Sequence, residues 1–593
     1  MNFKLRLIAL LLVVIMCLSS CEILGVGNTS DPTVKNPSNT KPSSSTVVES
    51  TTTKPITTTT TSSNTTSSTN TTAKPNETPT FDLSQHCTSK DELVKLYTLT
   101  AEEVEAAVSS LDAMVEKAQT SNDFETVMDA YYVFEEAYYH IAQQTTISML
   151  IYYYDTSDTT AETRYTDTNK MFNLLQSEYN EACKTMLETP YADNFFDGWS
   201  EADIESVRGY DPAIATLRDE IDALQVQYDQ LSSSDSKFKE KCVDIYKQLI
   251  TKSNQLAKLY GYDNYYDYAT VNVYGRDYEK KDIQKFREYL IQYVVPYVGT
   301  VRNNSVVPSS WVNAKKGRVE DFINNAFDLR PQRNYLIQYL NSLEGTMGDN
   351  MRHMFDNKNC VFSYSTTSHP TAFQTYLYED GIPFCLFGSS GNTATTVAHE
   401  IGHYYAALTN NKINNYDLCE THSQGNEALF VAYCEQHLSS DVYGVIRAHQ
   451  IFSFCYPLIM STLVDEFEQR VYTLESVENM TVADFDAIMD SVCAPYGGTV
   501  IVGGMLGYPV NDYWKMVTIN NPVYYISYAV SAAAALQIFA MAELDYDAAI
   551  SAYTTLVEGV TVGDGFLGAL EKAGLTTPFE EETFINIKGM LTQ

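Results

Sequence analysis

Two histidines four residues apart, with a glutamate between them, are the residues of this chain best suited to do chemistry. They occur in the stretch His399-Glu400-Ile401-Gly402-His403. On a helix, residues four apart lie on one face, about 6 Å apart along the axis. Two imidazoles at this spacing can therefore take two corners of a tetrahedral zinc site. Zinc lowers the pKa of a water that it binds, and Glu400 can accept the proton as that water attacks a carbonyl carbon. The stretch predicts a zinc site suited to hydrolysis.

A zinc site of this kind needs a third protein ligand, and the next predicted helix offers two glutamates. Glu420, Ser423 and Glu427 are spaced so that they share one face of that helix. Two buried glutamates on a partly apolar helix are costly unless a cation compensates their charge, so either of them can face the metal. The plain alternative is a solvated acidic face. His422 lies about 100° from the glutamate face and is predicted to form a structural hydrogen bond instead of binding the metal.

The zinc motif is predicted to lie on a helix that follows a small β-hairpin. Asn392 or Thr393 can cap the start of this helix. Before it, residues 373–378 and 382–387 have the composition of strands, and the residues between them form a turn signal. An exposed edge of such a sheet beside the zinc helix can pair with an extended peptide.

Most of the chain after residue 81 has helical spacing. Thr100 and Glu103 have the spacing of a capping box, and Asp211 with Pro212 marks the start of another helix. Similar patterns recur through about residue 345, whereas the glycine-rich stretch 495–509 is expected to form a mobile loop beside the site, or only turns. The predicted fold is mainly α, with a small β-sheet beside the helix that carries the zinc motif.

The first 21 residues have the features of an export signal. Lys4 and Arg6 precede an apolar run that is too short to cross a bilayer as a mature helix. The run ends in Leu18-Ser19-Ser20-Cys21, which resembles the lipobox of bacterial lipoproteins, where the cysteine is linked to diacylglycerol. The alternative is an ordinary signal peptide with a chance cysteine. A lipid on Cys21 predicts a protein anchored to the membrane, at the bacterial cell surface or otherwise outside the cytoplasm.

The remaining sequence divides into a stalk and a large domain. Residues 22–80 are rich in Thr, Ser, Asn, Pro and Lys and offer little to bury, which predicts a disordered stalk. Residues 81–593 are predicted to form one helical domain, with the zinc-binding catalytic part over about 350–593. The apolar stretch 529–542 is interrupted by Ser531 and Gln537 and is predicted to be a core helix, not a membrane span.

Composition excludes one class of partner. The 593 residues carry a formal net charge of −36, whereas proteins that bind nucleic acid need basic surfaces. We therefore expect no nucleic-acid partner. The 11 cysteines form no CxxC pair, and setting aside Cys17 and Cys21 leaves nine, an odd number that argues against a complete disulfide framework.

The zinc motif and the helix after it resemble the oligoendopeptidase F branch of the thimet-oligopeptidase-like zinc metallopeptidases. In that family, a glutamate at the head of an E-x-x-S-x-x-x-E helix is the third zinc ligand, and the second glutamate supports a histidine ligand. The resemblance implies that Glu420 binds a single zinc ion with His399 and His403, and that Glu427 stands behind a histidine. It also implies a large helical body with a deep cleft that admits oligopeptides.

A second block extends the resemblance toward the C-terminus. Residues 522–528, Pro-Val-Tyr-Tyr-Ile-Ser-Tyr, are similar to the family's tyrosine segment, whose phenols donate hydrogen bonds to the substrate carbonyl and the developing oxyanion. This implies catalytic roles for Tyr524, Tyr525 and Tyr528, although a purely structural role is the alternative in a chain with 44 tyrosines. Relatives often carry a histidine a few residues before the proline, and this chain has none near Val517.

These observations together predict a zinc-dependent endopeptidase that hydrolyses short peptides outside the cytoplasmic membrane. Its partners would be oligopeptide substrates and the membrane, through the lipid anchor. A zinc carboxypeptidase or dipeptidase of related fold is an alternative that would need a cationic group for the substrate carboxylate. A non-catalytic peptide-binding lipoprotein is another, and it predicts a degenerate motif, whereas His399, Glu400 and His403 are all present.

Overall fold

The computed structural model describes residues 81–592, apart from residues 200–203, 205–206, 209–211, 230, 232–234, 306–318, 320–326, 328–329, 378–380, 390 and 411–414. The predicted signal peptide, the lipidation site Cys21 and the predicted stalk over 22–80 lie outside the described residues. They stay predictions.

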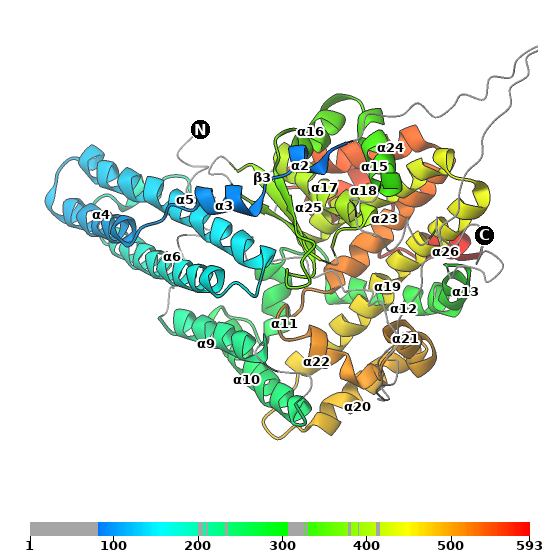
Figure 1. The fold of residues 1–593 in the computed structure, drawn as a ribbon. Helices are drawn as coiled ribbons and strands as arrows, with labels where there is room; N and C mark the ends of the chain where they lie inside the picture. The colour runs from blue at the N-terminus through cyan, green and yellow to red at the C-terminus, as the bar shows by residue number, and fades with distance from the viewer. Residues whose placement is uncertain are drawn as a thin grey trace, which may run out of the picture. The chain divides into compact units, whose positions relative to one another are not determined.

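Three long helices, α4 to α6, dominate the N-terminal part of the described chain (Figure 1). Each begins after a side chain that accepts a hydrogen bond from a backbone amide: Thr100 for α4, Asp123 for α5 and Asp158 for α6. Thr100 is the N-cap that the sequence predicts. The helices of this part are α2 (Leu83–His86), α3 (Lys90–Leu96), α4 (Ala101–Thr120), α5 (Phe124–Tyr154), α6 (Thr159–Met186) and α7 (Ala192–Phe195).

Helix α5 belongs to two hydrophobic cores along its length. Tyr131 and Phe134, in its first half, are buried with side chains of α4 and α6. Leu150, near its end, is buried in a second core with Phe373 and Leu386 from further along the chain. One continuous helix therefore connects the three-helix part to the region where the sequence predicts a sheet.

Within the described residues, the sheet has three strands in the order β1-β3-β2. β2 (Ala372–Tyr376) pairs antiparallel with β3 (Pro383–Phe387), which confirms the predicted hairpin. β1 (Cys360–Phe362), which the sequence analysis did not predict, pairs parallel with the other side of β3. All residues of the central strand β3 are buried, as expected for a strand covered on both faces.

The helices that follow α7 in the chain and precede the sheet begin with α9. This helix starts at Pro212 as predicted, whereas Asp211 lies outside the described residues. Ile214 and Leu224 of α9 are buried. The elements of this part are α9 (Pro212–Asp229), α10 (Phe238–Leu259), α11 (Tyr265–Tyr268), the π-helix η1 (Ala269–Val273), α12 (Lys280–Tyr293), α13 (Val295–Ser305), α15 (Arg330–Ser342) and α16 (Gly345–Asp356).

The centre of the fold is a layer of packed helices. α17 packs on β2 and β3, and α18 packs against both α17 and α23 (Figure 1). Among the helices that the structure describes, α23 alone has the length and apolar composition to cross a membrane. However, 78% of its most apolar 18-residue stretch is buried inside the protein. This confirms the predicted core helix. The layer consists of α17 (Ala394–Thr409), α18 (Tyr416–Tyr433), α19 (Ser440–Tyr472), α23 (Ile526–Leu544) and α24 (Tyr546–Glu558).

The prediction of a loop or of turns alone over 495–509 is wrong, because a helix occupies most of this stretch. Gly497 and Gly507 adopt φ of 86° and 75° and cap α21 at its two ends, which is a left-handed conformation that glycine favours. The remaining elements are η3 (Cys434–His437), α20 (Val482–Cys493), η4 (Ala494–Tyr496), α21 (Gly498–Leu506), η5 (Val510–Asp512), α22 (Trp514–Val517), α25 (Gly565–Lys572) and α26 (Glu581–Thr592).

Candidate metal centre

Helix α17 presents the three residues of the zinc motif. It begins after Thr393, whose hydroxyl accepts a hydrogen bond from the Thr396 amide at 3.2 Å. His399, Glu400 and His403 are all buried, because α17 lies between the sheet and α18. The four-residue spacing places the two imidazole rings on one face of the helix, with their centroids 5.1 Å apart.

Helix α18 passes close enough to α17 to bring Glu420 to the two histidines. The close approach occurs at Gly402, where a Cβ would lie only 2.5 Å from the carbonyl oxygen of His422. Asn426 joins the two helices a turn further on, since its side-chain amide donates a hydrogen bond to the Ala398 carbonyl at 2.6 Å. The helix that carries the predicted third ligand is therefore fixed directly against the helix that carries the other two.

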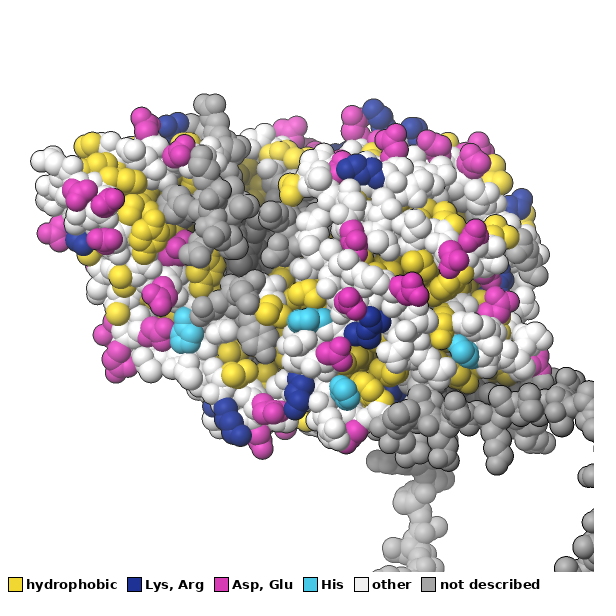
Figure 2. All heavy atoms as spheres, turned by 90° about the horizontal axis from the view of Figure 1, so that it is seen from above, with side chains coloured by type: hydrophobic (Ala, Val, Ile, Leu, Met, Phe, Trp, Pro, Cys, Tyr) yellow, Lys and Arg dark blue, Asp and Glu magenta, His cyan; other side chains and the backbone are white. Residues whose placement is uncertain are grey.

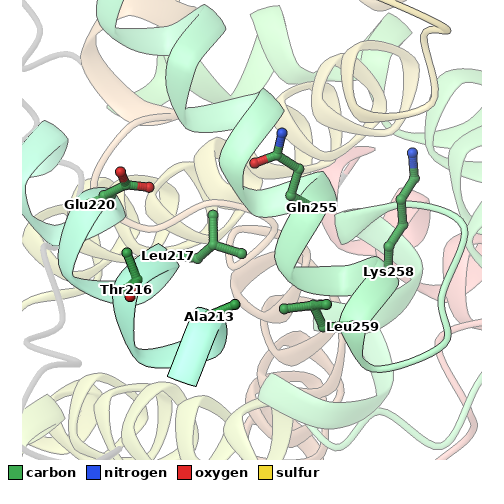
Figure 3. A pocket seen from close by; sticks show the side chains of 7 residues that line it. All are labelled: Ala213, Thr216, Leu217, Glu220, Gln255, Lys258 and Leu259. Atoms are coloured by element: carbon green, nitrogen blue, oxygen red, sulfur yellow. The ribbon is translucent and has the colours of Figure 1, made fainter. Parts of the chain in front are cut away.

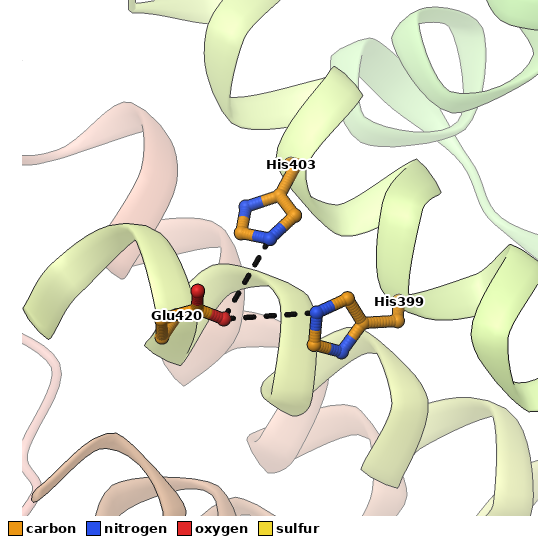
Figure 4. A group of neighbouring side chains, drawn as sticks. All are labelled: His399, His403 and Glu420. Atoms are coloured by element: carbon orange, nitrogen blue, oxygen red, sulfur yellow. Dashed lines mark ion pairs between the residues drawn. The ribbon is translucent and has the colours of Figure 1, made fainter. Parts of the chain in front are cut away.

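Three side chains converge on one point and together form what we call the metal group: His399, His403 and Glu420 (Figure 4). The Oε2 atom of Glu420 lies 3.6 Å from Nε2 of His399 and 3.7 Å from Nε2 of His403. One ligand atom from each residue lies within 4.8 Å of the others. Two nitrogens and one carboxylate oxygen at these separations can hold a metal ion, and this donor set is one that zinc accepts.

The surroundings of this group favour a positive charge. Glu400 is fully buried, and neither of its carboxylate oxygens accepts a hydrogen bond from the described residues. Burial raises the pKa of Glu400 to about 7, an effect that His399 opposes and that Glu420 and Glu427 reinforce. Buried carboxylates without a full complement of donors are costly unless a cation lies among them. The residues present therefore fit a metal cation.

The two histidines respond to these carboxylates in different ways. Burial alone would lower the pKa of His399, but its hydrogen bond to Glu427 and the nearby acidic charges raise that pKa to about 9. Burial dominates at His403 and lowers its pKa to about 3, which favours the neutral imidazole that can bind a metal. The nearby carboxylates thus favour a positive charge at His399. A metal ion bound to the ring would provide that charge in place of a proton.

Glu427 supports His399 from the side of the ring opposite Glu420. Its Oε2 atom lies 3.4 Å from Nδ1 of His399, whereas Nε2 of the same ring faces Glu420. Gln450 of α19 donates a hydrogen bond to the other oxygen of Glu427 at 2.6 Å. A carboxylate on the second ring nitrogen fixes the tautomer and orientation of a histidine ligand. Glu420 therefore faces one nitrogen of the His399 ring and Glu427 faces the other.

The Tyr524 hydroxyl, one of the three predicted phenols, donates a hydrogen bond to Oε1 of Glu420 at 2.9 Å. The rings of Tyr528 and Tyr525 lie 5.1 and 6.1 Å from the ring of Tyr524, and all three side chains are buried. Val517 is a buried residue of α22.

His422 is placed as a structural residue, as predicted. Its Nε2 atom lies 3.1 Å from the carbonyl oxygen of Leu556, and burial lowers its pKa to about 4. The ring is thus engaged with α24.

Three residues that shape this site were not predicted from the sequence: Gly402, Asn426 and Gln450. A glycine inside an otherwise good helix was a signal for close packing at position 402. Asn426 lies beside the glutamate face, and its burial marks it as a residue that needs a partner. Gln450 follows Glu427 by more than twenty residues and belongs to another helix, so no local pattern connects the two.

A hollow in the structure lies away from this group, between α9 and α10 (Figure 3). It has a volume of about 520 Å³ and a mostly apolar lining. None of its lining residues belongs to the metal group, so the deep cleft expected beside the zinc motif stays a prediction. The lining residues are Ala213, Thr216, Leu217, Glu220, Gln255, Lys258 and Leu259.

The molecular face in Figure 2 carries acidic side chains scattered among basic and apolar ones. On the described atoms of that face, lysines and arginines do not gather into one broad patch. On the face shown, the described acidic side chains are thus spread out and no concentrated basic surface lies among them.

No family model matches the sequence, and no curated protein matches it. Solved structures do match. Pz peptidase A, determined with an inhibitor, is 16% identical with a TM-score of 0.63, and the match covers 83% of this chain and 97% of that one. A chain assigned as an oligoendopeptidase F is 15% identical with a TM-score of 0.63, over 84% of this chain and 96% of that one. A Bacillus anthracis protein with the same assignment is 16% identical with a TM-score of 0.60, over 83% and 95%.

These matches extend over nearly the whole length of the solved chains, and they bear out the predicted helical body with its small sheet. At such low identity they show the fold. The fold of this chain is that of oligoendopeptidase F and the peptidases related to it.

Proposed function

We propose that this protein is a zinc-dependent endopeptidase that hydrolyses short peptides. The observation that carries the proposal is the convergence of His399, His403 and Glu420 within 4.8 Å, beside the buried carboxylate of Glu400, which accepts no hydrogen bond from the described residues. The fold supports the proposal, because this chain shares it with solved peptidases. The metal group alone would also suit zinc hydrolases that act on other substrates. The shared fold is the reason that we propose peptides as the substrates.

Each residue of the group has a part in this reaction. His399, His403 and Glu420 would hold the zinc ion, which when bound polarises a carbonyl oxygen and makes water a better nucleophile at neutral pH. Glu400 would accept a proton from the attacking water and pass it to the leaving amine. The Tyr524 hydroxyl, which donates its single proton to Glu420 in this structure, would release that hydrogen bond and donate instead to the substrate oxygen as negative charge develops there.

The sheet offers a place for an extended substrate. β2 is an edge strand, because among the described residues it pairs only with β3, and α17 packs against both strands. An edge strand can pair with the backbone of an extended peptide, and such pairing reads little of the peptide's sequence. We expect short, unfolded peptides of varied sequence to be the substrates.

Metal analysis and peptide digestion together test the proposal. The purified chain should contain one zinc ion per molecule, and digestion of a mixed peptide library should give internal cleavages that a chelator abolishes and zinc restores. Stepwise release of single C-terminal residues would instead identify a carboxypeptidase, and release of dipeptides a dipeptidase. Zinc-loaded protein that binds peptides without cleaving any would reject the enzyme and favour a peptide-binding lipoprotein.

We further propose that the protein is a bacterial lipoprotein held outside the cytoplasm by a lipid on Cys21, with residues 22–80 as its stalk. The proposal is supported by the apolar run and the Leu18-Ser19-Ser20-Cys21 sequence. Lipid chains contribute about 0.8 kcal/mol per buried methylene, so two or more of them give a lasting anchor. The Cys21→Ala variant should take up no labelled fatty acid and should leave the membrane fraction. Labelling that persists in this variant would refute the anchor.

A further inference from the structure

Val523, directly before Tyr524, has a backbone conformation that valine rarely adopts. Its φ is 67°, in the left-handed region where a β-branched side chain is crowded. The residue is fully buried, just before the chain enters α23. A strained conformation of this kind persists only where the surroundings fix it, and it is often found at functional sites.

Two ionisable side chains fix the backbone on either side of Val523. Glu468 of α19 accepts a hydrogen bond from the Val523 amide at 3.0 Å. The Arg276 guanidinium donates to the carbonyl of Val523 at 2.7 Å and to that of Tyr524 at 3.1 Å, through the same nitrogen. Both side chains are fully or almost fully buried. The peptide groups before and after Val523 are therefore each held by an ionisable group.

Arg276 also connects this segment to the helix that carries Glu420. Its Nε atom lies 3.9 Å from Oδ1 of Asp417, and both side chains are fully buried. Asp417 lies three residues before Glu420 on α18, and Glu420 accepts the hydrogen bond from the Tyr524 hydroxyl. α18 and the tyrosine segment are thus joined twice, through the backbone by Arg276 and through the side chain by the phenol.

We infer that Glu468 and Arg276 are positioning residues for Tyr524, which hold Val523 in the left-handed conformation that directs the Tyr524 hydroxyl toward Glu420 and the metal position. This rests on the proposed function, because it gives Tyr524 a part in the hydrolysis. Burying a carboxylate and a guanidinium is a poor way to gain stability alone, since apolar residues of similar size often serve as well. Their cost is explained if the orientation of one side chain matters.

The identity of residue 523 offers an internal test of this inference. Glycine adopts a φ near 67° without strain, so a glycine at position 523 needs less holding than valine does. If Glu468 acts by holding strained backbone, its loss should do less harm when position 523 is glycine. If Glu468 only fills the core, the residue at position 523 should make no difference.

The experiment compares four forms of the full chain: the parent, Glu468→Gln, Glu468→Met, and Glu468→Met combined with Val523→Gly. Burial raises the pKa of Glu468 well above its ordinary value, so neutral glutamine is a close substitute that keeps an acceptor oxygen. Methionine has a similar length and lacks that acceptor. Zinc content, kcat and KM for one peptide, and amide hydrogen exchange over residues 519–528 are measured for each form.

We expect Glu468→Met to speed exchange within 522–528 alone and to lower kcat at least about tenfold, with KM and zinc content nearly unchanged. Glu468→Gln should keep the parent's protection and most of its kcat. Adding Val523→Gly to Glu468→Met should raise kcat at least about threefold above that of Glu468→Met alone. The inference is overturned if Glu468→Met keeps the parent's kcat, or if glycine at 523 recovers nothing. An inactive parent would defeat the proposed function instead, and the exchange data would still show whether Glu468 holds the segment.

A second variant covers the case in which Glu468→Met does not fold. Arg276→Lys keeps a positive charge beside Asp417 but replaces the planar donor that reaches two carbonyl groups. It should lower kcat at least about tenfold while zinc content stays at the parent's level. Unchanged kcat in Arg276→Lys, with unchanged exchange over 519–528, would overturn the inference.

Discussion

Gly402 of α17 lies so close to His422 of α18 that no side chain fits between them. A Cβ at Gly402 would lie 2.5 Å from the His422 carbonyl oxygen and 2.8 Å from the Cα atom of Ser423. Because Gly402 stands next to His403 and His422 is two residues after Glu420, this contact sets the separation of the helices that carry the metal group. Backbone atoms cannot give way as the end of a flexible side chain can.

The Gly402→Ala substitution should therefore destabilise the protein, although alanine is the better helix former. Overpacking of this kind typically costs about 1–3 kcal/mol, which outweighs the roughly 1 kcal/mol that alanine gains over glycine in a helix. The matched control is Gly444→Ala in α19, where a Cβ meets no atom within 4 Å. Thermal unfolding should show a lower Tm for Gly402→Ala and an equal or higher Tm for Gly444→Ala. Equal shifts in both variants would show that the close contact carries no weight.

Replacement of Glu400 by glutamine should separate metal binding from turnover. Glu400 lies beside the metal group. The side-chain amide of glutamine cannot accept the proton that the attacking water must lose during hydrolysis. We expect zinc content to stay at the parent's level and kcat to fall at least about 100-fold. Glu102→Gln, at an exposed position of α4, is the control and should leave both unchanged. Near-normal turnover in Glu400→Gln would remove this residue from the mechanism.

Glu420 and Glu427 should differ in how much metal affinity depends on them. Glu420→Ala removes an oxygen that lies 3.6–3.7 Å from both histidine Nε2 atoms, so zinc affinity should fall severely. Glu427→Ala removes the support of His399 and should cost about 10–100-fold in affinity or activity. Zinc titrations of both variants must be made at one pH, because protonation of the ligands competes with the metal. A larger loss in Glu427→Ala would show that the two roles are exchanged.

The Tyr524→Phe variant should lose turnover with little change in binding of substrate. The missing hydroxyl removes a donor to developing negative charge, which typically costs about 100- to 1,000-fold in kcat. Tyr191→Phe is a matched control, since its hydroxyl also donates one hydrogen bond, to the Ser121 carbonyl at 3.0 Å, far along the chain in the three-helix part. A rise in KM with unchanged kcat would show that Tyr524 binds the ground state instead.

Features set by local spacing could be predicted from the sequence. The four-residue step places His399 and His403 on one helical face whatever surrounds them, and Thr393 caps the helix because its short side chain can reach a free amide. The hairpin of β2 and β3 was also visible, since both strands and their turn lie within sixteen residues. In each case the chemical pattern and the structure it produces occupy the same short stretch of chain.

Features that depend on distant contacts could not be predicted. β1 is three residues long, and its parallel pairing with β3 brings together strands with β2 between them in the chain. The hydrogen bonds of Gln450 to Glu427 and of the Val523 amide to Glu468 each join segments whose sequences give no sign of each other. α21 was missed for another reason: its capping glycines look like turn residues until the helix between them is known.

Helix α5 makes the three-helix part and the sheet mechanically dependent on each other. It has 31 residues, which at 1.5 Å per residue gives a rod about 46 Å long. Its two ends are buried in different cores, and the core at its C-terminal end includes Phe373 of the edge strand β2. A tilt of about 5° about that end would carry the far end through roughly 4 Å, as the length of the rod dictates. Because that end packs in the same core as β2, a movement of the three-helix part is coupled through α5 to the strand where we expect the peptide to lie.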